Sequence, residues 1–144
     1  MKLELRDCYG FPVPPPVLYQ LIRERPPYSR VSHKKMPSIK QHERFYSSCP
    51  FRYWLVIIKG KECIGAIECT NNNEIGISIL REHQRKGYAT AAIKLFFRNY
   101  KPLPAIPAIR NGSWLVNVAP DNLHAQVFFY TLGFRLIQYT MVKT

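Results

Sequence analysis

The stretch Gln84-Arg85-Lys86-Gly87-Tyr88-Ala89-Thr90-Ala91-Ala92 places two cations and a glycine directly before a predicted helix. Glycine allows the backbone to approach a ligand closely. The unpaired N–H groups of a first helical turn, together with the helix dipole, favour an anion at that point. The stretch therefore fits a phosphate group, although a glycine before a helix also serves simply as a turn residue.

The hydrophobic pattern on both sides of this stretch predicts one mixed α/β domain over residues 1–144. In the predicted helix at 37–48, Ile39 and Phe45 are expected to face inward. The three middle strands are expected to form an antiparallel meander. The predicted helices are 17–25, 37–48, 88–100 and 122–132, and the predicted strands are 2–8, 52–60, 61–70, 73–80, 113–120 and 134–142.

The charge balance predicts an anionic partner, because 21 Lys and Arg face only nine Asp and Glu, a formal net charge of +12. Nucleic acid, a membrane surface and a phosphate-bearing cofactor or substrate all satisfy this requirement. Cysteines at 8, 49, 63 and 69 form no C-x-x-C pair, so neither a disulfide framework nor a metal site is predicted. No stretch approaches the roughly 18 apolar residues of a membrane span, and we expect a cytoplasmic protein.

Two motifs resemble those of the GNAT superfamily of N-acetyltransferases. Gln84, Gly87 and Ala89 fill the fixed positions of its Q/R-x-x-G-x-G/A signature. The later stretch 122–134, NLHAQVFFYTLGF, is similar to the family's N-x-x-A…L-G-F helix. The resemblance implies a single GNAT-like domain, with a central, mostly antiparallel sheet flanked by helices and splayed between its fourth and fifth strands.

The resemblance also implies acetyl-CoA as cosubstrate, with its pyrophosphate on the amides of the glycine loop. Its pantetheine arm would lie between the strands at 74–80 and 114–119. Asn122 would lie near the arm, or else it caps the following helix, a role for which Asp121 competes. The implied cofactor-binding residues are Ile77, Ile79, Gln84, Arg85, Lys86, Gly87, Tyr88, Ala89, Thr90, Asn117 and Asn122.

Acetyl transfer needs an unprotonated amine, so a base or a water relay must accept a proton from it. By resemblance Glu74 is the first candidate for that base and Glu68 the second. The family often places a tyrosine, as general acid, where this chain has Phe129. Tyr130 is one residue late, a rotation of about 100° on a helix, so either it is reoriented or water protonates the leaving thiolate. Direct transfer is expected, since no cysteine lies on the two cofactor-binding segments.

The acceptor is expected beside a basic run at 23–44, with His42, Lys34, Lys35 and Tyr46 as candidate contacts. Basic residues favour an anionic amine, such as a nucleotide-linked amino sugar or a similar small metabolite. The alternatives are an amine on nucleic acid (a modified base or aminoacyl-tRNA) and a non-catalytic nucleic-acid-binding module on the same fold. His42 could instead be an exposed helix residue, and His83 is expected to face solvent. Oligomeric state is not predicted.

Overall fold

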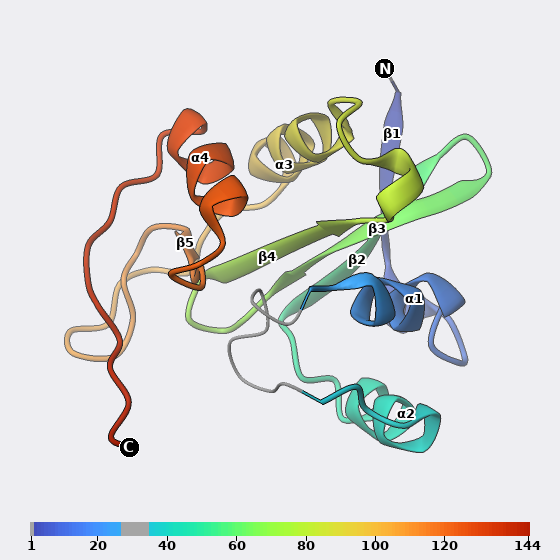
Figure 1. The fold of residues 1–144 in the computed structure, drawn as a ribbon, viewed down its shortest axis with the longest axis horizontal. Helices are drawn as coiled ribbons and strands as arrows, with labels where there is room; N and C mark the ends of the chain where they lie inside the picture. The colour runs from blue at the N-terminus through green and yellow to red at the C-terminus, as the bar shows by residue number, and fades with distance from the viewer. Residues whose placement is uncertain (1, 27–34) are drawn as a thin grey trace.

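A computed structural model describes residues 2–26 and 35–144 of the chain (Figure 1). The middle strands and the long helix lie where the hydrophobic periods predict them. The elements, in chain order, are β1 (Leu3–Asp7), η1 (Cys8–Gly10), α1 (Pro16–Glu24), α2 (Ile39–Ser47), β2 (Tyr53–Lys59), β3 (Glu62–Cys69), β4 (Glu74–Ile79), η3 (Arg81–His83), α3 (Tyr88–Asn99), β5 (Leu115–Val116) and α4 (Leu123–Thr131).

The strands form one sheet in the order β1-β2-β3-β4-β5. The first three pairings are antiparallel, and β5 runs parallel to β4. Gly60, at a φ of 64°, allows the tight turn from β2 to β3. Since β5 pairs with β4 only through Glu74↔Leu115 and Ile75↔Val116, the two strands separate beyond that point. The predicted splay between the fourth and fifth strands is confirmed.

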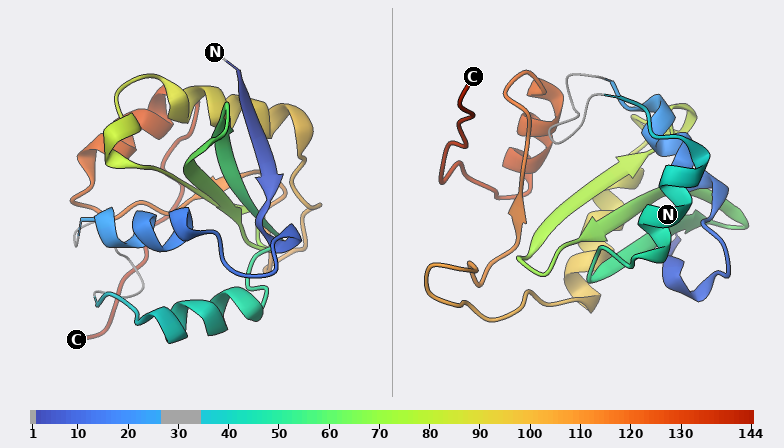
Figure 2. Two further views of the ribbon diagram at one scale, coloured as in Figure 1. Left: turned by 90° about the vertical axis from the view of Figure 1, so that its right-hand side faces the viewer. Right: turned by 90° about the horizontal axis from the view of Figure 1, so that it is seen from below.

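Helices cover both faces of the sheet. α1 and α2 lie on one face, and α3 lies on the other with α4 beside it (Figures 1 and 2). The strand β2 is apolar from Tyr53 to Ile58 because its side chains alternate between two cores, whereas Lys59 at its end is exposed. Trp54, Val56 and Ile58 pack toward α1 and α2, while Leu55 and Ile57 pack toward α3. None of the helices within the described residues is long and apolar enough to cross a bilayer.

The start of α2 is confirmed, but its inward face is not the predicted one. Ser38 caps the helix and forms a reciprocal capping box with Gln41. Ile39 is 56% exposed, and the buried side chains are His42 and Tyr46. One turn separates His42 from Tyr46, whose hydroxyl donates to the Cys8 and Phe11 carbonyl oxygens, and these bonds fix which face of the helix packs.

The predicted strand at 134–142 is wrong. α4 ends at Thr131, and Gly133, with a φ of 95°, then turns the chain. Residues 135–144 then form neither helix nor strand and are exposed. A strand needs a neighbouring backbone to complete its hydrogen bonds, and none of the described segments pairs with this one. The predicted strand at 113–120 is likewise reduced to Leu115–Val116.

Candidate functional site

The glycine loop leaves β4, passes through η3 and enters α3. Arg85 and Gly87 both have left-handed backbones, with φ of 61° and 83°, so the chain turns sharply on either side of Lys86. No side chain caps α3 at Gly87. The first-turn amides of the helix, which have no acceptor within it, therefore remain open to an anion. Arg85 and Lys86 are exposed at the rim and add positive charge.

The Gln84 side chain bonds within the loop. Its Nε2 donates to the Ile79 carbonyl oxygen over 2.9 Å, which ties the loop to the end of β4. Its amide is engaged by the chain, where the resemblance implied a contact to the cofactor. Tyr88 opens α3 with its ring beneath the Lys59 ammonium, 5.3 Å from the ring centroid. Ala89 and Thr90 are half-buried in the first turn.

The open edge of β4 lies beside the same loop. The Leu80 N–H donates to Ile64 of β3, and strand alternation aims the backbone groups of Ile77 and Ile79 at the opposite edge. β5 no longer pairs with β4 at these residues. Gln84 occupies the Ile79 carbonyl, so the Ile77 backbone and the Ile79 N–H border the splay. An extended amide-bearing ligand can pair with such an edge.

Both candidate bases lie on the face of the sheet covered by α1. Glu68 of β3 pairs in register with Gly76 of β4, and Glu74 shares that face because it lies two residues before Gly76. Burial raises the pKa of the Glu68 carboxyl, an effect that the charge of Arg25 only partly offsets. Arg25 Nη2 lies 3.4 Å from Ser78 Oγ on the same face. The structure thus brings a carboxyl and a guanidinium together beside the open edge.

Glu74 is held differently. Its Oε1 accepts from the Thr70 hydroxyl over 3.2 Å, and its Oε2 accepts from Asn117 Nδ2 over 2.5 Å. Both carboxylate oxygens are thereby occupied at the paired end of β4 and β5. Asn117 was implied as a cofactor contact, but its side-chain amide bonds to Glu74.

On α4, Phe129 and Tyr130 point to different sides of the helix, as expected for neighbouring helical residues. Phe129 is buried at 9% exposure and packs against Phe134, with ring centroids 5.5 Å apart. Tyr130 is 63% exposed, and its ring lies under the Arg135 guanidinium. The role of Tyr130 as general acid stays a prediction. Asn122 caps α4, since its Oδ1 accepts from the Ala125 N–H over 3.2 Å.

Two residues expected at the acceptor site, His42 and Tyr46, are buried in the core between α2 and the sheet. His42 is 4% exposed between the Tyr19 and Trp54 rings. Its two ring nitrogens have no hydrogen-bond partner within the described chain, and burial lowers its pKa. The Tyr46 hydroxyl is used by backbone carbonyls. Lys35 is exposed, and Lys34 lies outside the described residues.

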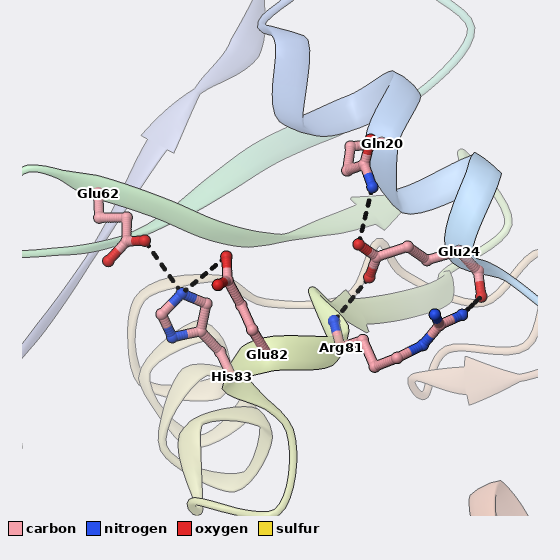
Figure 3. Close-up of polar contacts among 6 residues, drawn as sticks. All are labelled: Gln20, Glu24, Glu62, Arg81, Glu82 and His83. Atoms are coloured by element: carbon pink, nitrogen blue, oxygen red, sulfur yellow. Dashed lines mark hydrogen bonds and ion pairs between the residues drawn. The ribbon is translucent and has the colours of Figure 1, made fainter.

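A carboxylate connects α1 to the turn before the loop (Figure 3). The Arg81 N–H donates to Glu24 Oε1 over 2.6 Å, and Gln20 Nε2 donates to Glu24 Oε2 over 2.9 Å. Burial alone would raise the pKa of Glu24, but these hydrogen bonds and the charge of Arg81 hold it below its ordinary value. No local sequence signal marks this connection, because it joins residues 57 positions apart.

These elements define an α/β protein in which a glycine loop with open first-turn amides lies beside an open strand edge. The model of the acetyltransferase (GNAT) family matches residues 16–134, and the chain belongs to that family. Acetyl-CoA, the family's cosubstrate, is its acyl donor. The open first-turn amides and the splay fit a diphosphate with an amide-bearing arm.

Two solved structures share the fold. One is an acetyltransferase from Thermus thermophilus, with 18% identity and a TM-score of 0.67, covering 96% of this chain and 90% of that one. The other is an aminoglycoside antibiotic 6'-N-acetyltransferase from Acinetobacter haemolyticus, with 14% identity and a TM-score of 0.57, covering 100% of this chain and 97% of that one. A search of curated proteins gives no match.

Proposed function

We propose that this protein transfers an acetyl group from acetyl-CoA to a primary amine by direct attack, with Glu68 as the base. The observation that carries the proposal is the position of Glu68. It lies opposite Gly76 of β4, and Gly76 directly precedes Ile77, whose backbone borders the open edge. Its raised pKa suits a group that accepts a proton from an ammonium or from a water between them. Glu74, with both oxygens hydrogen-bonded, is the weaker candidate.

In this reaction the amine nitrogen attacks the acetyl carbonyl carbon. A C–N bond forms, the C–S bond breaks, and the proton of the amine passes to Glu68 directly or through water. Coenzyme A leaves as a thiolate and takes a proton from solvent. The buried thiols are poor nucleophiles, because burial raises the pKa of Cys69 to about 11 and also raises that of Cys8. Direct transfer accordingly needs no acetyl-cysteine intermediate.

The acceptor that best fits the charge is anionic. The face that carries Glu68 also carries the Arg25 guanidinium beside Ser78, and Lys35, Lys40 and Arg44 are exposed on or before α2. With a net charge of +12, the chain attracts a nucleotide-linked amino sugar or a similar phosphate-bearing amine. Aminoglycosides are polycations, so the same charge disfavours the class of acceptor named for the Acinetobacter neighbour.

A panel of amines tests this proposal. Release of coenzyme A thiol is measured with nucleotide-linked amino sugars, an aminoglycoside and aminoacyl-tRNA, each over a range of salt concentrations. We expect turnover with the nucleotide-linked amine and a shallow dependence of KM on salt. A steep slope of log affinity against log salt concentration, approaching one for each phosphate contacted, would instead indicate a nucleic-acid acceptor. If the protein binds acetyl-CoA and acetylates none of these amines, the anionic-acceptor proposal fails.

A further inference from the structure

Three potential metal ligands meet next to the glycine loop at 84–90, which we also call the cofactor loop, and they lie outside the proposed catalytic site. Glu62 is the first residue of β3, whereas Glu82 and His83 belong to η3. The Leu80 N–H donates to Ile64 over 2.8 Å, and this bond brings the start of β3 against η3. One donor atom from each of the three residues lies within 4.8 Å of the other two (Figure 3).

The spacing of these atoms matches a coordination sphere. His83 Nε2 lies 3.1 Å from Glu62 Oε1 and 3.7 Å from Glu82 Oε1. A tetrahedral site with bonds of about 2.0–2.2 Å to nitrogen and oxygen separates its ligand atoms by roughly 3.3–3.6 Å. The two observed separations lie just below and just above that range, and the two glutamate oxygens lie within 4.8 Å of each other, so rotation of these exposed side chains would close the site around a cation.

The imidazole is fixed and aimed. His83 is 8% exposed and packs beside the Tyr88 ring, with centroids 6.2 Å apart. Its Nδ1 is buried with no hydrogen-bond partner among the described residues, so Nε2 carries all the polar contacts of the ring. The Glu62 and Glu82 side chains are 57% and 72% exposed, which leaves the cluster open to solvent on their side. His83 was expected to face solvent, and this expectation is wrong.

Within the cluster itself carboxylates outnumber the imidazole, although the charge of Glu62, after the Tyr88 hydroxyl, also helps to raise the pKa of nearby Lys59. Two carboxylates face one imidazole, which can neutralise at most one of them. Within the part of the chain that the structure describes, neither glutamate forms an ion pair with a lysine or arginine, although the whole chain has 21 of these residues. A divalent cation would supply the missing charge.

We infer that Glu62, Glu82 and His83 form a binding site for a divalent cation of the zinc class, with a fourth position left to water. One imidazole nitrogen and two carboxylate oxygens suit Zn²⁺ and its neighbours, whereas Mg²⁺ and Ca²⁺ prefer oxygen alone. His83 directly precedes Gln84, so a bound cation would join the β2–β3 hairpin to the first residue of the cofactor loop. The inference does not depend on the proposed acetyl transfer.

Metal titration of the full chain tests this site. After treatment with a chelator, the protein is titrated with Zn²⁺ by calorimetry and with Co²⁺ by visible absorption. We expect one equivalent to bind, an intense tetrahedral Co²⁺ spectrum and a higher thermal midpoint with Zn²⁺. Glu62→Gln and Glu82→Gln should each weaken binding by about tenfold or more, since even outer partners of metal ligands are worth about 10–100-fold.

The controls remove similar groups elsewhere. Glu43→Gln deletes another exposed carboxylate and His124→Gln another imidazole, and both should leave the affinity unchanged. Because Glu62 and Glu82 are exposed, their glutamine variants should fold, which circular dichroism verifies. The inference is overturned if the parent protein binds no Zn²⁺, or if the Glu62→Gln/Glu82→Gln double variant binds it as tightly as the parent. His83 would then simply pair with two surface carboxylates.

Discussion

Glu68 and Gly76 face each other across β3 and β4, and the missing side chain of Gly76 leaves the space that the Glu68 carboxyl occupies. A Cβ at Gly76 would lie 3.0 Å from Glu68 Cδ and closer still to Oε1. Glycine within a strand often marks such a close approach. The pair places a carboxyl with a raised pKa beside the open edge of β4.

The first prediction concerns the base. Glu68→Gln should lower kcat by about 10²–10⁴-fold, the usual contribution of general base catalysis, and leave acetyl-CoA affinity nearly unchanged. The loss should be smallest at high pH, where the amine deprotonates unaided. Steady-state kinetics against pH measure it, with Glu74→Gln as the matched control. If Glu74→Gln shows the larger loss in kcat, the base is Glu74, as the family resemblance alone suggested.

The second prediction concerns the stability cost of that carboxyl. A glutamate whose pKa is raised in the folded state loses its contribution to stability as pH rises through the folded pKa. Glu68→Gln cannot ionise, so its free energy of unfolding should exceed that of the parent at neutral pH. The difference should vanish below the ordinary glutamate pKa, about 4.3. Urea unfolding at several pH values measures this, and a variant less stable than the parent at neutral pH would contradict it.

The third prediction tests the cofactor loop. Gly87→Ala places a Cβ on a left-handed residue at the start of α3. We expect acetyl-CoA affinity to fall by roughly tenfold or more, equivalent to losing one hydrogen bond to a charged group (about 1.5–3 kcal/mol). Gly60→Ala is the matched control, because Gly60 also has a left-handed backbone, with a φ of 64°, but belongs to the β2–β3 turn and not to the loop itself. Calorimetry should show that only the Gly87 variant loses affinity; equal affinities would place the diphosphate elsewhere.

The local elements of this fold could be predicted because their signals lie within a few residues. The apolar run of β2, the period of α3 and the Ser38 cap are of this kind. The strand at 134–142 could not be excluded from its sequence, since alternation shows that a segment can pair but not that a partner is present. The inward face of α2 likewise depends on Tyr46 reaching carbonyls about 35 residues away.

The candidate site divides in the same way. The loop at Gly87 follows from a local signature, and the structure keeps its first-turn amides open. The choice between Glu68 and Glu74 as base depends on cross-strand register. That register places Glu68 opposite Gly76, whereas Glu74 lies beside Asn117 and accepts a hydrogen bond from it. The burial of His83 could not be predicted from its neighbours in the sequence, because its partner Glu62 lies 21 positions earlier.

The fourth prediction concerns the proline-rich loop at 101–112. Asn73 is fully buried, donates to the Leu103 and Asn111 carbonyls, and accepts from the Leu103 N–H. It thereby anchors the loop at the end of β4 opposite the cofactor loop. Asn73→Gly keeps the left-handed backbone but removes these bonds, and should lower the free energy of unfolding by about 2–4 kcal/mol. Asn72→Gly, exposed in the same turn, is the control for denaturant unfolding; equal losses would show that Asn73 anchors nothing.

The last prediction concerns His42, which α2 buries between the rings of Tyr19 and Trp54. Burial lowers its pKa, an effect that nearby Glu43 only partly offsets. The unfolded chain therefore binds the proton more readily, so stability should fall as pH drops below the ordinary histidine value of about 6.5. His42→Phe should flatten that fall between about pH 5 and 7, because phenylalanine fills the same space without a titrating nitrogen. Urea unfolding across this range measures the slope. His124→Phe, on the exposed side of α4, should keep the parental slope, and a His42→Phe slope as steep as the parent's would mean that another group titrates.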